Sequence, residues 1–541
     1  MALLLLDQGK PAEAQTIASR AVAADPKNSE SYSFLGRALL AQNEYSEALQ
    51  QFDRGISIQG NDASLHYGRA AALENLNRPS DAEISLRLAV QMSPEPDGLV
   101  KVAESDRTLR RVDDALKYCR RALKMDPNHA TANRLTARIL TEEGRLDEAA
   151  SYWDRAKELG TDVVDVYVTK ANALLTAGLF EAGIAEFRGA VEIAPRRWEP
   201  YNGIVSAKRV AESDRPLVAQ MHHIIEDPAT SIDDRLNLHY AIGKAHDNLG
   251  EYELAMHHFD EANRMKLNET QLVPHFSADE LRGETDDKIR TFTPALIKQI
   301  HKGANTSDRP TFVVGMMRSG TTLAEQILTC HSRVGGASEQ PFWREWEPQV
   351  INWKNGHVYR ERLQPLADRF CTLLNTIAPG KRHVVDKNPA NSMIVGLLHL
   401  AYPNARIIHT VRHPVDTALS IWMTLMQTAA PFVCDRDHIV FAYREYQRLA
   451  DHWRSVISPD RYLEVQYEDL VLDREQVTRQ MVEFCDLEWE DACLYPENNL
   501  RAVKTPSFWQ VRQPVYATSL ERWKHYEPWL GAFRELLPSR V

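Results

Sequence analysis

The sequence has little of what a membrane protein or a nucleic-acid-binding protein needs. It contains no run of about 18 apolar residues, the length that a membrane-spanning helix requires. The apolar opening segment 1–6 lacks a basic start and meets Asp7 and Lys10 too soon for a secretory signal. With a net charge of −11, the chain offers no overall basic surface, which argues against nucleic acid as its main partner.

Cysteine is also scarce. The six cysteines are far apart and include no Cys-x-x-Cys pair, a spacing that favours reduced, buried thiols over a disulfide framework or a zinc site. We therefore expect a cytoplasmic protein. A chain of 541 residues exceeds the size at which one hydrophobic core keeps growing, so two or more structural units are expected.

The first half of the chain is periodic. A small residue recurs every 33 or 34 residues, at Ala14, Ala48, Ala82, Ala115, Ala149 and Gly183. In most units a bulky residue follows one helical turn later, at Phe52, Leu86, Trp153 and Phe187. Proline and glycine turn signals separate the segments, so each unit is predicted to be two helices joined by a turn.

This pattern resembles the tetratricopeptide repeat family, most clearly in Tyr32-x-x-Leu-Gly followed by Ala48 and Phe52. The resemblance implies an all-α solenoid over residues 1–266. Such arrays commonly present a concave face that binds polypeptides, so we expect the repeat arm to hold a peptide or protein.

The array has two irregularities. Only seven residues precede the turn at Gln8-Gly9, so the first helix of the first repeat is expected to be truncated. After Gly183 the register breaks and resumes only at Ala255, which predicts a loose unit over residues 198–235.

A second unit is expected to begin near residue 305, after a helical linker over 267–305. The apolar run 311–315 predicts a strand, and the amphipathic run 323–331 predicts a helix. Between them lies the loop Gly315-Met-Met-Arg-Ser-Gly-Thr-Thr322. Backbone N–H groups and a helix N-terminus converge in such a loop, so it is predicted to hold an oxyanion.

The loop differs from a nucleotide-triphosphate loop at one decisive place. In G-x-x-x-x-G-K-[ST] a lysine follows the second glycine, whereas this sequence has Thr321 there. Arg318 inside the loop provides a positive charge instead, and it suits bidentate contact with a phosphate or sulfate oxygen. The predicted ligand is therefore an oxyanion other than a triphosphate.

The loop resembles the 5′-phosphosulfate loop of sulfotransferases, most closely that of the tyrosylprotein sulfotransferase branch. A second motif supports the resemblance, because the expected strand 406–411 is followed by Arg412 and, eight residues later, Ser420. The family holds the 3′-phosphate of its donor with an arginine and a serine at that spacing. The resemblance implies a sulfotransferase domain over 306–541 that uses 3′-phosphoadenosine 5′-phosphosulfate (PAPS) and releases the desulfated nucleotide (PAP).

Weaker matches extend the expected cofactor site. Tyr467 falls where the family has an adenine-contacting tyrosine after a strand, while Ser507 and Arg522 resemble late cofactor contacts. Arg522 stands where the relatives have lysine. The cofactor contacts implied by the resemblance are Arg318, Ser319, Gly320, Thr321, Thr322, Arg412, Ser420, Tyr467, Ser507 and Arg522.

The resemblance also implies catalytic roles. Glu339 lies 21 residues after Arg318, where the tyrosylprotein branch places its general base. Lys387 matches the family's strand-end lysine, whose ammonium stabilises the leaving oxygen, and Arg318 shares the transition-state charge. His331 and His413 are alternative bases, because other branches use histidine. No divalent metal is implied, since the transferring group carries less negative charge than a phosphoryl group.

The sequence therefore predicts an all-α tetratricopeptide solenoid followed by an α/β sulfotransferase domain with a largely parallel sheet and its donor at the strand ends. The expected reaction moves a sulfuryl group to a hydroxyl. A protein or peptide tyrosine is favoured as acceptor, and a carbohydrate or small-molecule alcohol remains open. A P-loop kinase and a nucleotide-sensing repeat scaffold are the alternatives of another class. Whether the chain forms a homodimer is left open.

Overall fold

The computed structural model describes residues 1–76, 78–108, 111–160, 162–268, 273–298, 304–426, 430–499, 501 and 509–538. By its internal contacts the chain divides into two units, Met1–Val166 and Tyr167–Val541. Within the described ranges, no helix combines the length and the apolar character needed to cross a membrane.

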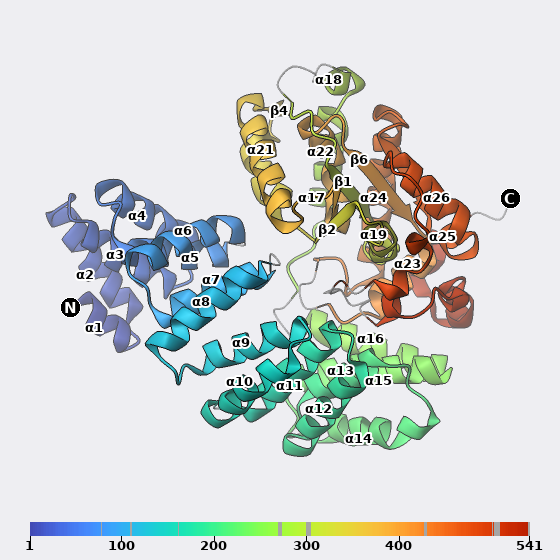
Figure 1. Ribbon diagram of the computed structural model, residues 1–541, viewed down its shortest axis with the longest axis horizontal. Coiled ribbons are helices and arrows are strands. Elements are labelled where there is room, and N and C mark those ends of the chain that lie inside the picture. The colour runs from blue at the N-terminus through green and yellow to red at the C-terminus, as the bar shows by residue number, and fades with distance from the viewer. Residues whose placement is uncertain are drawn as a thin grey trace. The chain divides into compact units, whose positions relative to one another are not determined.

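Antiparallel helix pairs build the first unit (Figure 1). Its first helix has six residues. The helices are α1 (Ala2–Asp7), α2 (Pro11–Ala24), α3 (Ser29–Leu40), α4 (Tyr45–Ile58), α5 (Ala63–Asn75), α6 (Pro79–Met92), α7 (Pro96–Thr108), α8 (Val112–Met125), α9 (Ala130–Glu142) and α10 (Leu146–Leu159), with α11 (Val163–Thr176) crossing the boundary between the units.

Small residues allow these helices to pack around large ones. Phe52 of α4 is fully buried, and a Cβ added at Gly36 or Gly68 would lie 2.6 or 2.3 Å from its ring. Ala48, one turn earlier on α4, is equally buried. The backbones of α3 and α5 can approach the ring this closely only because they carry glycine at the contact. The predicted helix-turn-helix repeats are confirmed.

Helices continue into the second unit. The predicted loose segment 198–235 contains a short pair, α13 and α14, which have ten and twelve residues. The helices that precede the sheet are α12 (Phe180–Ile193), α13 (Trp198–Ala207), α14 (Arg215–Glu226), α15 (Ile232–Leu249), α16 (Tyr252–Asn268), α17 (Ala278–Thr291) and α18 (Pro294–Lys298), with the 3₁₀ turn η1 (Glu212–Asp214) before α14.

Five parallel strands then form one sheet in the order β2-β5-β1-β6-β7. The strands are β1 (Pro310–Gly315), β2 (Val334–Ser338), β5 (His383–Lys387), β6 (Arg406–Val411) and β7 (Tyr462–Gln466), and β3 (Ile351–Asn352) and β4 (His357–Val358) form a separate antiparallel pair. Val313 of β1 pairs with Lys387 on one side and with Ile408 on the other. Because all five strands run in one direction, their carboxyl ends lie along one edge. The predicted parallel sheet is confirmed.

Helices cover both faces of the sheet (Figure 1). They are α19 (Thr321–Thr329), α20 (Phe342–Val350), α21 (Arg360–Ile377), α22 (Val395–Ala401), α23 (Pro414–Trp422), α24 (Arg436–Val456), α25 (Tyr467–Leu472) and α26 (Arg474–Phe484). The shorter 3₁₀ segments are η2 (Pro389–Ile394), η3 (Asp491–Leu494), η4 (Pro496–Asn498), η5 (Gln510–Arg512), η6 (Ala517–Ser519), η7 (Arg522–Trp529) and η8 (Gly531–Leu536).

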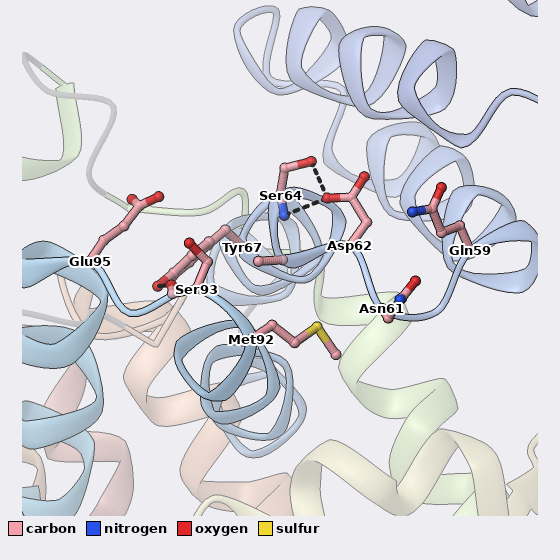
Figure 2. Close-up of a pocket in the computed structure, with 9 residues that line it drawn as sticks. Gln59, Asn61, Asp62, Ser64, Tyr67, Met92, Ser93 and Glu95 are labelled. Atoms are coloured by element: carbon pink, nitrogen blue, oxygen red, sulfur yellow. Dashed lines mark hydrogen bonds between the residues drawn. The ribbon is translucent and has the colours of Figure 1, made fainter.

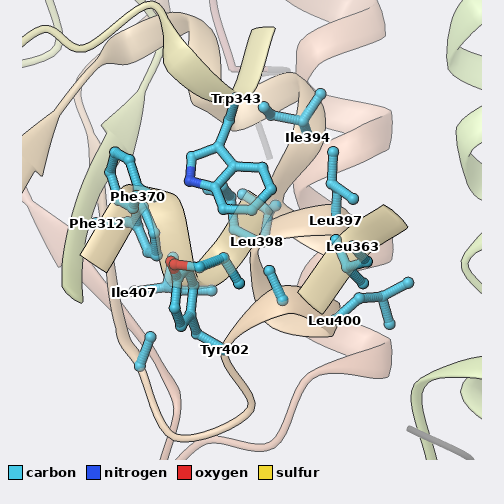
Figure 3. Close-up of a cluster of buried hydrophobic side chains, with 14 of the residues drawn as sticks. Phe312, Trp343, Leu363, Phe370, Ile394, Leu397, Leu398, Leu400, Tyr402 and Ile407 are labelled. Atoms are coloured by element: carbon cyan, nitrogen blue, oxygen red, sulfur yellow. The ribbon is translucent and has the colours of Figure 1, made fainter. Parts of the chain in front are cut away.

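An aromatic cluster fixes one face of the sheet to its helices. Phe312 is buried in β1, and its ring lies 6.1 Å from Phe370 of α21 and 6.2 Å from Tyr402, measured between ring centroids. Figure 3 shows Trp343 of α20 beside the same rings. Every residue of β1 is buried, because helices pack on both of its faces.

The last repeat helices share a core with the α/β domain. Phe259 of α16 lies in the same apolar cluster as Trp422 of α23 and Tyr526 of η7. Polar contacts reinforce this packing, since the amide of Asn263 donates to the Trp422 carbonyl at 2.9 Å and the Lys266 ammonium donates to the Met426 carbonyl at 2.6 Å. The α15–α16 pair is therefore part of the body that carries the strand ends.

Replacing Phe52 with alanine should destabilise the first unit by about 3 to 5 kcal/mol, because the change leaves a cavity lined by residues that cannot close it. Urea unfolding followed by circular dichroism measures the loss. Ile58→Ala on the same helix removes a side chain that is 41% exposed, and it should cost far less. Equal losses for the two variants would contradict the packing described for Phe52.

Candidate active site

The loop after β1 has the geometry of an anion cradle. Arg318 adopts a left-handed conformation with φ +70°, which is uncommon for a residue other than glycine. Gly320, with φ +98°, is the N-cap of α19, and a Cβ there would lie 2.4 Å from the ring of Tyr467. The Ser319 hydroxyl lies 2.9 Å from that of Thr410 on β6. The loop is thus held to two neighbouring strand ends, and α19 begins at its rim.

Arg318 connects the predicted nucleotide-binding residues. Its Nε donates to the Ser420 hydroxyl at 3.0 Å, and its backbone carbonyl accepts from the Arg412 guanidinium at 3.3 Å. Burial, together with the positive charges of Arg412 and Arg522, lowers the pKa of Arg318 to about 10. The structure therefore brings Arg318, Arg412 and Ser420 together in a region where a negative charge would be stabilised.

Arg412 is buried at the end of β6 with unused hydrogen-bonding capacity. One amino group donates to the Ser519 carbonyl at 2.7 Å, and the guanidinium lies 4.8 Å above the ring of Tyr467. The Tyr467 hydroxyl in turn lies 2.8 Å from that of Ser519. The Nε of Arg412 is buried without a hydrogen bond in the part of the chain that the structure describes. A buried arginine with an unused donor fits an anionic ligand group.

Glu339 and Lys387 meet at the ends of two adjacent strands. Glu339 follows β2, Lys387 is the last residue of β5, and the Lys387 ammonium donates to the Glu339 carboxylate. The two partners differ in accessibility, because the side chain of Lys387 is 1% exposed and that of Glu339 is 47% exposed. A molecule approaching from solvent would therefore reach the carboxylate before the ammonium.

The remaining predicted residues fall into three groups. Thr321 and Thr322 are buried at the first two positions of α19, whereas Ser507 lies outside the described residues. Arg522, at the start of η7, forms an ion pair with Asp247 of α15. At the strand-end edge, the contacts given above connect Arg318, Ser319, Gly320, Arg412, Ser420, Tyr467, Glu339 and Lys387.

The two alternative bases are engaged in packing contacts. His331 is buried, its Nε2 lies 2.8 Å from the Glu488 carbonyl and its Nδ1 accepts from the backbone N–H of Arg333. The ring of His413 stacks on Trp523 with centroids 5.6 Å apart. The contacts of His331 are those of a packed side chain, whereas Nδ1 of His413 is buried without a hydrogen bond among the described residues, so both histidines stay alternatives to Glu339.

The repeat helix α15 contributes two residues that sequence reasoning missed. Asp247 accepts a hydrogen bond from the Tyr526 hydroxyl at 2.7 Å in addition to its ion pair with Arg522. Lys244, one turn earlier, has its ammonium 3.8 Å from Asp247. Burial lowers the pKa of Lys244 to about 8, and the charges of Arg522 and Arg318 act in the same direction. Nothing in the repeat pattern separates these residues from ordinary helix-surface positions.

A second missed group supports the end of β5. Asp386 is fully buried next to Lys387, and it accepts hydrogen bonds from the backbone of Gln340 and the amide of Asn391, both at 3.2 Å. Burial raises the pKa of Asp386 to about 8, and the nearby carboxylate of Glu325 also raises it. An acid held largely neutral at this position preserves the pairing of Lys387 with Glu339.

A hollow in the first unit has a simpler explanation. It has a volume of about 420 Å³ and lies between successive repeats (Figure 2). Asp62 caps α5 by accepting from the Ser64 backbone at 2.9 Å, and the Tyr67 hydroxyl donates to the Ser93 carbonyl at 3.0 Å. Helix capping and repeat packing explain these polar groups, so the strand-end edge is the stronger candidate site.

A parallel sheet, a glycine-containing loop after its central strand and arginines at the neighbouring strand ends are typical of an α/β domain of the P-loop-like class. Residues 310–491 match the sulfotransferase family, and residues 5–72, 103–163 and 236–269 match tetratricopeptide repeats. The chain therefore contains tetratricopeptide repeats and a sulfotransferase-family domain, which implies a PAPS-dependent sulfotransferase.

Two relatives and one solved structure illustrate the similarity. The chain is 28% identical to an uncharacterized protein of Aquifex aeolicus (strain VF5), over 94% of this chain and 70% of that protein. It is 27% identical to the protein-tyrosine sulfotransferase of Drosophila melanogaster, over 39% of this chain and 46% of that protein. The sulfotransferase domain of the Synechococcus PCC 7002 olefin synthase matches with a TM-score of 0.33 and 20% identity, over 44% of this chain and 100% of that domain. The chain thus spans less than half of the Drosophila protein.

Asp386→Asn should flatten the dependence of stability on pH. The pKa of Asp386 is about 8 in the folded chain, so between pH 4 and pH 8 the folded state retains a proton that the unfolded state releases. Wild-type stability should therefore fall as pH rises through this window, by up to about 1.4 kcal/mol per pH unit from this group. Urea unfolding at several pH values measures the slope.

The exposed residue Asp437 provides the control, because Asp437→Asn should leave the wild-type slope unchanged. Parallel stability curves for the wild type and Asp386→Asn would contradict the raised pKa of Asp386.

Proposed function

We propose that the chain transfers a sulfuryl group from PAPS to the hydroxyl of a protein or peptide tyrosine. The observation that carries the proposal is the convergence of two groups of residues on one sheet edge. Arg318 contacts both Arg412 and Ser420 around the loop after β1. The Glu339–Lys387 ion pair lies at the ends of β2 and β5, on the β5 side of that loop.

The donor would lie along the strand ends from β7 toward β2. Tyr467, which follows β7, would contact the adenine, and Arg412 and Ser420 would hold the 3′-phosphate. The unused Nε of Arg412 supports this assignment. The loop residues Arg318 to Thr322 would hold the 5′-phosphosulfate at the N-terminus of α19. When bound, PAPS supplies the activated sulfuryl group.

Arg522 and Ser507 are retained as further donor contacts. The position of Arg522 supports this role, because its charge acts on Arg318 and it is paired with Asp247. The carboxylate orients the guanidinium and offsets part of its charge.

Proton movement during transfer is assigned to the ion pair. The half-exposed Glu339 carboxylate accepts the proton of the acceptor hydroxyl, because it is the partner that an incoming group can reach. The buried Lys387 ammonium donates a hydrogen bond to the oxygen that leaves with the nucleotide, and Arg318 shares the charge that develops there. Their mutual contact keeps the base and the leaving-group donor in a fixed relation.

Two observations support a polypeptide acceptor. The Drosophila relative is named for sulfation of protein tyrosine. The repeat array provides a surface of the kind that holds peptides, and its helix α15 reaches the arginine cluster through Asp247. We further propose a reducing, cytoplasmic compartment, because all six cysteines are free thiols.

Arg412→Ala should lower the affinity for PAP by about ten- to a hundredfold, because a charge-assisted contact to the 3′-phosphate is lost. Binding of AMP, which lacks that phosphate, should change little. Isothermal calorimetry measures both, and the exposed residue Arg444 on the same domain serves as a control through Arg444→Ala. If wild-type protein binds PAP no better than AMP and binds ATP with Mg²⁺ tightly, the kinase alternative is favoured.

Glu339→Gln should reduce transfer of ³⁵S from labelled PAPS to a tyrosine peptide by about a hundredfold or more, because the amide cannot accept the hydroxyl proton. Its affinity for PAP should stay within about twofold of wild type, since the residue is assigned to the acceptor side. Initial rates and calorimetry on the same preparation separate the two effects.

The exposed residue Glu361 supplies the matched control, and Glu361→Gln should retain the wild-type rate. A Glu339→Gln protein that keeps more than half of the rate would refute the assignment of the base. Label recovered from host extract in a carbohydrate or a small alcohol, with none in tyrosine, would refute the acceptor and leave the donor assignment intact.

A further inference from the structure

Three histidines gather between three successive repeat helices. They are His222 of α14, His246 of α15 and His258 of α16, and each offers one ring nitrogen within 4.8 Å of the others. The Nε2 atoms of His222 and His246 are 3.0 Å apart, and the ring centroids of His222 and His258 are 5.0 Å apart. Two nitrogens of a tetrahedral zinc site lie roughly 3.3 Å apart, so this spacing is close to that of a ligand set.

The outer contacts of the rings resemble those around bound metals. His246 contacts the Glu251 carboxylate through Nδ1 at 2.6 Å, which leaves its Nε2 as the available ligand. Glu251 is itself held by Arg215 at 2.8 Å. The Nδ1 of His258 lies 2.9 Å from that of His239. A carboxylate on the far nitrogen of an imidazole fixes the orientation and tautomer of a metal-ligating histidine.

The cluster is difficult to explain by packing alone. His246 and His258 are 5% and 4% exposed, and the Nε2 atoms of His222 and His246 face each other, so only one of the two nitrogens can donate a proton to the other. His222 is half-buried, so one of the three rings is reached by solvent.

We propose that His222, His246 and His258 form a binding site for a divalent transition metal of the zinc type, with a fourth position left for water. The site would join α14, which belongs to the irregular unit where the repeat register breaks, to the α15–α16 pair. Because α16 shares a core with the α/β domain, the metal would stabilise the end of the array that carries Asp247. No step of the proposed transfer uses this ion.

Zinc titration of the full chain after dialysis against a chelator tests the proposal. We expect one Zn²⁺ per chain by competition with a chromophoric chelator, and a higher melting temperature when zinc is present. His222→Gln should weaken binding at least tenfold, and Glu251→Gln should weaken it by about ten- to a hundredfold through loss of the orienting carboxylate. PAP binding by each variant reports whether its α/β domain is folded.

His223, exposed and adjacent on α14, supplies the matched control, and His223→Gln should bind zinc as wild type does. The proposal is overturned if the wild type takes up no zinc, or if His222→Gln binds as tightly as His223→Gln. Should His222→Gln fail to fold, cobalt added to the wild-type chain decides the question. A tetrahedral ligand-field spectrum supports the site, and a spectrum identical to that of aqueous cobalt overturns it.

Discussion

Repulsion between positive charges at the strand ends is the constraint on which the site depends. Burial lowers the pKa of Arg318, and the positive charges of Arg412 and Arg522 lower it as well, while Arg522 and Arg318 act in the same direction on the buried Lys244. Burial alone would lower the pKa of Arg522, but its ion pair with Asp247 raises that pKa, so the charge at this arginine is compensated, whereas the pKa of Arg318 stays lowered. The buried positive charges therefore destabilise the strand-end edge of the folded chain, and a ligand with two or three negative charges would relieve this effect. Ligand binding should for this reason stabilise that edge.

The strand order explains how distant segments reach this edge. β1 lies between β5 and β6, although β2 follows it in the chain, so each flank of the phosphate loop receives a different segment. On the β5 side of the loop, Lys387 ends β5 and Glu339 follows the neighbouring strand β2. On the β6 side, Arg412 follows β6 and Tyr467 follows the neighbouring strand β7. A parallel sheet thus separates the proposed transfer chemistry from nucleotide recognition by the width of its central strand.

Much of this arrangement could be predicted from local patterns. The repeat period depends on contacts such as Ala48 with Phe52 that recur along the sequence, and the loop around Arg318 is a continuous motif. Boundaries were less accurate, because α19 begins at Thr321, two residues before the apolar pattern starts. Lys244 and the histidine cluster were missed for a different reason. Lys244 owes its significance to Arg318 and Arg522, which are far away in the chain, and the histidines meet across three different helices, so no periodic signal records either set of partners.

The Asp247–Arg522 ion pair has a consequence for how this architecture can be inherited. If the chain were cut near residue 305, Arg522 would lose the carboxylate of Asp247 while still partly buried. Trp422 and Phe533 would lose the apolar residues of α15 and α16 that cover them. Losing one partner of a buried pair typically costs about 3 to 5 kcal/mol. Recombination that replaced the whole repeat array would therefore be selected against. Replacement of the repeats before α15 would keep the Asp247–Arg522 pair. The boundary at which modules can be exchanged therefore lies within the repeat array and not at its end.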